Sequence, residues 1–165
     1  MTGALPVRVL FVCMGNICRS PIVEGVFRKC LEIRASALVI EVDSAGTHSY
    51  HVDASPDHRA QSAAGRRGID ISTLRARRVE AADFERFDYI LAMDQLNLET
   101  LRAEASAEYH DKIRLFMDFS RANPGAEVPD PYYGSANGFE RVLDLAEEAA
   151  EGLLIELEKA TGSAG

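Results

Sequence analysis

The apolar and polar positions of this 165-residue chain alternate between short apolar runs and longer stretches with helical spacing. The short runs predict buried strands at 7–12, 38–42, 89–93 and 113–116. The longer stretches predict helices at 20–34, 59–67, 94–105 and 139–157. Strands that alternate with helices indicate an α/β protein, in which a parallel sheet is covered by helices on both faces and a ligand binds at the carboxyl ends of the strands.

Two stretches rich in turn-forming residues separate these predicted elements. Residues 43–57 are rich in Ser, Gly, Asp, His and Pro, which is typical of a surface loop, and we expect them to form one wall of a pocket. Residues 123–138 contain three prolines and three glycines, and a loop of that length usually carries function. Because no repeat or linker divides the chain, we expect a single domain over residues 1–165, with an ordered core at about 5–160.

Composition and charge narrow the class of protein. Hydrophobic residues make up 47% and charged residues 27% of the chain, as in an ordinary globular protein, and no apolar run approaches the roughly 18 residues of a membrane span. The net charge of −8 argues against nucleic acid or an anionic membrane as a partner. Cys13, Cys18 and Cys30 are odd in number and lie close together, which favours a reducing compartment over a disulfide framework. With no secretion signal in view, we expect a cytoplasmic protein.

Two groups of basic residues receive a structural interpretation. The local cluster of arginines at the end of the second predicted helix and shortly after it is interpreted as a solvated face, in preference to a surface that receives acidic substrates. The scattered histidines match no metal-ligand spacing, so they are interpreted as surface residues, and we expect neither a metal nor a cofactor. The arginines of the cluster are Arg66, Arg67, Arg75, Arg77 and Arg78, and the scattered histidines are His48, His51, His58 and His110.

The chemistry is carried by five residues between Cys13 and Arg19, followed by Ser20, in the pattern C-x5-R-S. We call the intervening residues 14–18 the cradle loop. A tetrahedral phosphate needs several donors on one side, and a short turn that leads into a helix N-terminus can direct its backbone N–H groups inward. Gly15 predicts close backbone approach with a positive φ, and Asn16 predicts a side chain that ties the loop to itself.

The side chains at the two ends of the cradle loop complete a phosphate-transfer site. Arg19 offers a planar fork for two phosphate oxygens. A helix N-terminus and a guanidinium both favour the thiolate of Cys13, and the hydroxyl of Ser20, also expected to cap the helix, is placed to donate to that sulfur. The structural alternative is a small buried cysteine and a solvated arginine. The preceding strand and the following Ser20-Pro21 helix start favour the functional interpretation.

Three separated motifs carry a resemblance to a known family. They are Val9-Leu10-Phe11-Val12-Cys13-Met14-Gly15-Asn16-Ile17-Cys18-Arg19-Ser20-Pro21, Asp43-Ser44-Ala45-Gly46-Thr47 and Asp130-Pro131-Tyr132-Tyr133-Gly134. In this order the chain resembles the low-molecular-weight protein tyrosine phosphatases over nearly its whole length. The resemblance implies a four-stranded parallel sheet of strand order 2-1-3-4 in a flavodoxin-like three-layer sandwich. It also implies metal-independent hydrolysis of phosphotyrosine through a phosphocysteine intermediate.

The resemblance also assigns functions to individual residues. It makes Cys13 the nucleophile, Arg19 the phosphate and transition-state ligand, and Asp130 the general acid, since a phenolate leaves more easily when a carboxyl group protonates it. The implied substrate-binding residues are Met14, Gly15, Asn16, Ile17, Cys18, Ser20, Tyr50, Tyr132 and Tyr133. The implied supporting residues are Asp43, Ser44 and Asp94.

Aromatic walls would select the substrate, because a long flat phenyl phosphate reaches the bottom of a slot that phosphoserine cannot. Tyr50 stands where many family members carry tryptophan. Thr73 or Leu74 stands where some carry a supporting histidine, so both departures concern substrate preference.

The implied partner is a tyrosine-phosphorylated protein, such as a bacterial tyrosine kinase, and the protein is expected to be a monomer or weak dimer. A reversible Cys13–Cys18 disulfide is a further hypothesis, with a space-filling buried thiol as its alternative.

Three other functions are weighed against this prediction. An arsenate reductase would need an external thiol, because no cysteine follows Cys30. A protein-arginine phosphatase carries a threonine where this chain has Ile17, which favours an aromatic substrate. A non-catalytic phosphate-binding module would need neither Cys13 nor Asp130 and is the least favoured.

Overall fold

The computed structural model describes residues 6–34, 37–132, 134 and 137–161. Its elements are β1 (Val7–Cys13), α1 (Arg19–Arg34), β2 (Ile40–Gly46), α2 (His58–Gly65), α3 (Ala81–Arg86), β3 (Tyr89–Ala92), α4 (Gln95–Glu104), η1 (Ala107–Lys112), β4 (Ile113–Leu115), η2 (Phe116–Phe119) and α5 (Asn137–Ala160). The strands form one parallel sheet in the order β2-β1-β3-β4, so the predicted strand order is confirmed.

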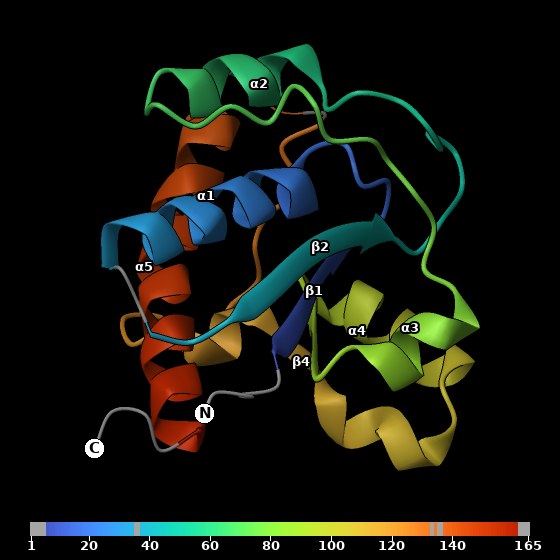
Figure 1. Ribbon diagram of the computed structural model, residues 1–165. Helices are drawn as coiled ribbons and strands as arrows, with labels where there is room; N and C mark the ends of the chain where they lie inside the picture. Colours follow the sequence, from blue (N-terminus) through green and yellow to red (C-terminus); the bar gives the residue numbers. More distant parts are fainter. Residues whose placement is uncertain (1–5, 35–36, 133, 135–136, 162–165) are drawn as a thin grey trace.

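Helices cover both faces of this sheet. Figure 1 shows α1, α2 and α5 on one side of the strands and α3 and α4 on the other. Because successive strand residues point to opposite faces, Val9 and Phe11 join the core beneath α1 and α5, whereas Leu10 and Val12 join the core with α3 and α4. Phe11 packs edge-on against Phe27 of α1, with ring centroids 5.6 Å apart. The three-layer sandwich is therefore confirmed.

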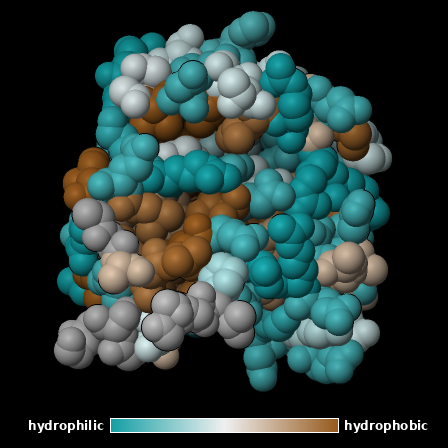
Figure 2. All heavy atoms as spheres, in the orientation of Figure 1, coloured by the Kyte–Doolittle hydropathy of each residue, from teal (hydrophilic) through white to brown (hydrophobic). Residues whose placement is uncertain are grey.

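Helix α5 is amphipathic, as its spacing predicted, whereas α1 is buried on all sides from Arg19 to Phe27. In α5 the predicted apolar stripe from Phe139 to Leu157 is buried throughout. Figure 2 shows the result on one face, where hydrophilic side chains dominate and an apolar area lies beside α1. Ile33 and Val39 are among the exposed large apolar residues. No helix of the described residues is both long and apolar enough to cross a membrane.

The second strand differs from its prediction. The expected strand ended at residue 42, whereas β2 continues to Gly46, and Asp43 and Ser44 pair with Leu10 and Phe11 of β1. These polar residues fit a strand because their side chains are hydrogen bonded, Ser44 Oγ to Glu24 and Asp43 to Arg77. The short elements α3, η1 and η2 were not predicted, because six residues or fewer show too little periodicity.

Candidate active site

The nucleophile candidate lies where the sequence predicts it. Cys13 is the last residue of β1, α1 begins at Arg19, and the cradle loop joins the two. The loop follows the carboxyl end of β1, and β1 is a central strand between β2 and β3. In open α/β sheets, ligands bind at the carboxyl ends of the strands. Thr47 N donates to Cys13 O at 2.9 Å, and His48 N donates to Met14 O at 3.0 Å. The loop is thus attached to the chain that follows β2.

Two donors face the sulfur of Cys13. Asn16 N lies 3.3 Å and Ser20 Oγ 3.1 Å from Sγ, and Cys13 is only 3% exposed. The Ser20 hydroxyl accepts a hydrogen bond from Asn16 Nδ2 at 2.8 Å, so its single hydrogen can be donated to the sulfur, while Ala45 O lies farther away at 3.5 Å. Ser20 lies in the first turn of α1, so its hydroxyl serves the sulfur instead of capping the helix. Asn16 N and Ser20 Oγ can therefore both donate hydrogen bonds to this sulfur.

The positive φ of the cradle loop lies at Asn16 (58°), so the prediction that Gly15 would adopt it is wrong. Asn16 tolerates the left-handed region because its side chain bonds nearby groups. Its Nδ2 also donates to Ser44 Oγ at 3.0 Å, and Ser44 Oγ donates to Glu24 Oε1 at 2.7 Å. The prediction that Asn16 ties the loop down is confirmed. The space at Gly15 is nevertheless needed, because a Cβ there would come within 3.0 Å of the His51 ring.

Arg19 is held by acidic and carbonyl groups from distant parts of the chain. Its Nη1 donates to Asp94 Oδ2 at 2.6 Å and to Val128 O at 3.1 Å, and its Nη2 lies 3.7 Å from Asp130 Oδ2. Burial works to lower the pKa of Arg19, but Cys13, Asp94 and Asp130 together raise that pKa above its ordinary value. The guanidinium therefore stays charged and points in a fixed direction although it is only 4% exposed.

A cavity of about 360 Å³ opens above the cradle loop. It is lined by Cys13, Met14, Gly15, Ile17, Cys18, Arg19, Tyr50, His51, Asp130 and Tyr132. Tyr50 is 74% exposed and stacks on His48 at 5.3 Å, and Tyr132 lies 6.5 Å from the His51 ring. Tyr133, which was also assigned to the slot, lies outside the described residues. The cavity brings the predicted nucleophile, cation, carboxylate and two tyrosines together.

The remaining assigned residues support the loop or line it. Asp94 caps α4 through Asn97 N at 2.8 Å while it holds Arg19, and Asp43 bonds Ser44 N and Arg77. Burial first, and then the charge of Asp57, raises the pKa of the Cys18 thiol far above its ordinary value. Cys18 is therefore a neutral thiol at neutral pH, and its proposed disulfide with Cys13 stays a prediction.

The segment that follows Thr73 and Leu74 contacts the cradle loop through a backbone group. Thr73 is exposed and Leu74 packs against the core, whereas Arg77 N donates to Asn16 Oδ1 at 3.0 Å. Arg77 itself is half-buried between two carboxylates, so its assignment to a solvated arginine face is wrong. The sequence around Arg77 did not indicate that its side chain is half-buried. One acidic partner, Asp43, lies 34 positions away, and the other, Asp83, lies in the short helix α3 that was not predicted.

Two further residues were missed. Glu24 is 1% exposed beneath the loop, and burial, opposed by bonds from Ser44 and Arg28, raises its pKa. A carboxylate between the apolar residues Val23 and Val26 was a usable signal. His51 lines the cavity instead of lying on an uninvolved surface, and nothing distinguished it from the other histidines. Among the described residues, no three His, Cys, Asp or Glu side chains are grouped as a metal ion requires.

Comparisons with known proteins agree with this geometry. Residues 8–163 match the family profile described as low molecular weight phosphotyrosine protein phosphatase. The chain therefore belongs to this family. The protein-tyrosine-phosphatase YfkJ of Bacillus subtilis is 38% identical over 153 residues, which cover 93% of this chain and 97% of the relative. The human low molecular weight phosphotyrosine protein phosphatase is 42% identical over 136 residues, which cover 81% and 85% of the two chains.

Solved structures give the same result. A crystal structure of a protein tyrosine phosphatase from Entamoeba histolytica, with Hepes in its active site, is similar with a TM-score of 0.90 and 41% identity, covering 94% of this chain and 99% of the other. The predicted family and its fold are therefore confirmed.

Proposed function

We propose that this protein is a cysteine-dependent phosphatase that removes phosphate from phosphotyrosine in proteins. The observation that carries the proposal is the convergence of the Cys13 sulfur, the Arg19 guanidinium and the Asp130 carboxylate on one cavity. The guanidinium binds a phosphate dianion, and the sulfur attacks its phosphorus atom. The carboxyl group protonates the leaving oxygen. We place the protein in the cytoplasm, where its partners would be tyrosine-phosphorylated proteins, a tyrosine kinase among them.

In the first step the phosphate occupies the cradle loop. Asp94 and Val128 hold the Nη1 side of Arg19, so the Nε and Nη2 side can bind two phosphate oxygens. The Cys13 thiolate attacks phosphorus and forms an S–P bond while the P–O bond to the tyrosine breaks. Protonated Asp130 gives its proton to the departing phenolate oxygen. The products of this step are a free tyrosine side chain and phosphocysteine.

In the second step water hydrolyses the phosphocysteine. The carboxylate of Asp130 takes a proton from the water as its oxygen bonds to phosphorus, and the S–P bond breaks. The sulfur leaves as a thiolate that accepts hydrogen bonds from Ser20 Oγ and Asn16 N. Inorganic phosphate is released, and the enzyme returns to its starting state without a cofactor.

The walls of the cavity support a phenyl phosphate as substrate. Cys13, Tyr50 and Tyr132 all line the cavity, and Cys13 is nearly inaccessible whereas Tyr50 is largely exposed. A short phosphoserine stem would leave phosphorus above the sulfur, and a flat ring fills the space between two aromatic side chains. Ile17 adds an apolar surface to the same cavity, which favours a phenyl ring over the polar guanidinium of phosphoarginine.

Hydrolysis of p-nitrophenyl phosphate in the presence of EDTA tests the proposal. The parent protein is expected to be active, Cys13→Ser to be inactive, and Asp130→Asn to lose about 100-fold in kcat, the size of a general-acid contribution. Cys30→Ser is the matched control, because this half-buried cysteine lies on α1 outside the cavity, and it should keep the parent rate.

Phosphotyrosine, phosphoserine and phosphoarginine peptides of one sequence then identify the substrate. A preference for the phosphoarginine peptide would overturn the substrate assignment. An inactive parent, or an active Cys13→Ser variant, would overturn the mechanism itself.

A further inference from the structure

Residues 76–79, which we call the Arg77 segment, run beside the end of β2 and touch the cradle loop. Gly46 N donates to Arg77 O at 2.8 Å, and Val79 N donates to Gly46 O at 2.9 Å. Arg77 N donates to Asn16 Oδ1 at 3.0 Å. One residue therefore bonds the last residue of β2 with its carbonyl group and the cradle loop with its amide group.

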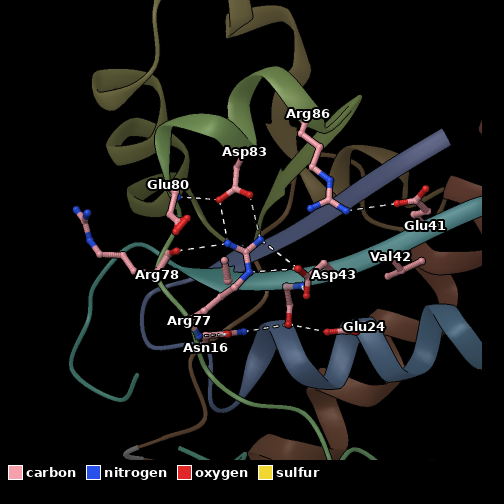
Figure 3. Close-up of polar contacts among 12 residues, drawn as sticks. Asn16, Glu24, Glu41, Val42, Asp43, Arg77, Arg78, Glu80, Asp83 and Arg86 are labelled. Atoms are coloured by element: carbon pink, nitrogen blue, oxygen red, sulfur yellow. Dashed lines mark hydrogen bonds and ion pairs between the residues drawn. The ribbon is translucent and has the colours of Figure 1, made fainter. Parts of the chain in front are cut away.

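The side chain of Arg77 fixes this segment to two other elements. Its Nη1 and Nη2 donate to Asp83 Oδ2 and Oδ1 of α3 at 3.0 and 3.1 Å, and its Nε donates to Asp43 Oδ2 of β2 at 3.2 Å. Figure 3 shows the guanidinium between these two carboxylates. Burial works to lower the pKa of Arg77, but Asp83 and Asp43 raise it, so the charge is retained. A bidentate pair to a buried carboxylate holds its geometry better than a surface pair.

From Arg77 a continuous series of hydrogen bonds leads to the sulfur. With its carbonyl oxygen held by Arg77 N, the Asn16 side chain must direct Nδ2 toward Ser20 Oγ. Ser20 Oγ, which accepts from Nδ2, has one hydrogen left, and the nearer of its two acceptors is Cys13 Sγ at 3.1 Å, with Ala45 O at 3.5 Å. If the Arg77 segment moved, Asn16 could turn its amide, and Ser20 would lose the donor that sets the direction of its hydrogen.

We propose that Arg77 is a positioning residue for the catalytic thiolate, acting through the amide of Asn16 and the hydroxyl of Ser20. The inference rests on the proposed function of Cys13. Arg77 touches neither the sulfur nor the cavity, and its effect depends on the side-chain anchors at Asp43 and Asp83. The neighbouring Arg78 offers a comparison, because its side chain is 49% exposed, pairs with Glu104 at 2.9 Å and points away from this network (Figure 3).

The test combines Arg77→Met with Ser20→Ala in a double-mutant cycle. Arg77→Met keeps the length of the side chain and removes its charge, and Arg78→Met is the matched control. The readouts are kcat and KM for p-nitrophenyl phosphate, and the rate at which iodoacetamide alkylates Cys13, followed on the Cys13 peptide by mass spectrometry. Iodoacetamide is neutral, so the rate reports the sulfur alone. All rates are compared at temperatures where thermal denaturation shows each variant to be folded.

Arg77→Met is expected to lower kcat and the alkylation rate about tenfold with little change in KM, a coupling typical of residues in one hydrogen-bond network. In the Ser20→Ala background the same substitution should lower both rates less than twofold, because the series of bonds is already cut. Arg78→Met should match the parent. Arg77→Lys, which keeps the charge without spanning both carboxylates, should fall between the parent and Arg77→Met.

Equal losses with and without Ser20 would overturn the proposal, as would parent rates in folded Arg77→Met. If Arg77→Met does not fold, Arg77→Lys takes its place in the cycle, and parent rates there overturn the proposal equally. Failure of the proposed function has a different signature. In that case the parent protein lacks phosphatase activity, while the alkylation rates still show whether Arg77 acts on the sulfur.

Discussion

Replacement of Asn16 tests the strained centre of the cradle loop. Asn16→Ala removes three hydrogen bonds, those to Ser20, Ser44 and Arg77 N, each worth about 1 kcal/mol of net stability. It also places a residue with a Cβ at φ 58°, where alanine is strained by about 1 kcal/mol. We therefore expect the free energy of unfolding to fall by roughly 4 kcal/mol in Asn16→Ala.

Asn16→Gly separates the two contributions. It loses the same hydrogen bonds but tolerates the positive φ, so it should be about 1 kcal/mol more stable than Asn16→Ala. Urea denaturation followed by circular dichroism gives both values, and kcat/KM for p-nitrophenyl phosphate should fall at least about tenfold in each variant. If the alanine and glycine variants were equally stable, the strain argument would be refuted. If both lay within 1 kcal/mol of the parent, the hydrogen bonds would not have the assigned strength.

Two further predictions concern stability away from the sulfur. Gly152→Ala should destabilise the protein by about 1–3 kcal/mol, because its Cβ would come within 2.0 Å of Phe119 O, whereas Gly65→Ala meets no atom within 4 Å and should be neutral or slightly stabilising; thermal denaturation of both variants decides this. Asp57 caps α2, and its hydrogen bonds with Arg59 lower its pKa, so its contribution is present above the unfolded value of about 3.9 and disappears as the pH falls through the lower folded value. Asp57→Ala should therefore lower the free energy of unfolding by about 1 kcal/mol at neutral pH, with a gap from the parent that narrows below about pH 4, and a constant gap would contradict the argument.

The parts that the sequence predicts well are those built from neighbours along the chain. The strand, cradle loop and helix from Val7 to Arg34 follow from one apolar run, one C-x5-R-S pattern and one helical stripe. The position of Asp130 was predicted because a proline-rich loop and a family motif coincide there. The strand order also followed from the resemblance.

The parts that could not be predicted depend on contacts between distant residues. Arg77 is separated from Asp43 by 34 positions and from Asn16 by 61. Its neighbours in the sequence are other arginines, and these indicated only a solvated face. The end of β2 was missed for the same reason, because the hydrogen bonds that hold Asp43 and Ser44 come from β1, α1 and the Arg77 segment. His51 enters the cavity through the course of a loop that has no periodic pattern.

The long-range attachment of the cradle loop has a consequence for the order in which this protein matures. The loop and Arg19 are synthesised early, but the residues that hold them follow later along the chain: Ser44 and Arg77 hold Asn16, and Asp94 and Val128 hold Arg19. Synthesis runs from the N-terminus, so an emerging chain contains Cys13 and the groups beside its sulfur well before it contains the residues that hold Asn16 and Arg19 in place. The surroundings of Cys13 are therefore complete only after Val128, in the final third of the chain, has been synthesised.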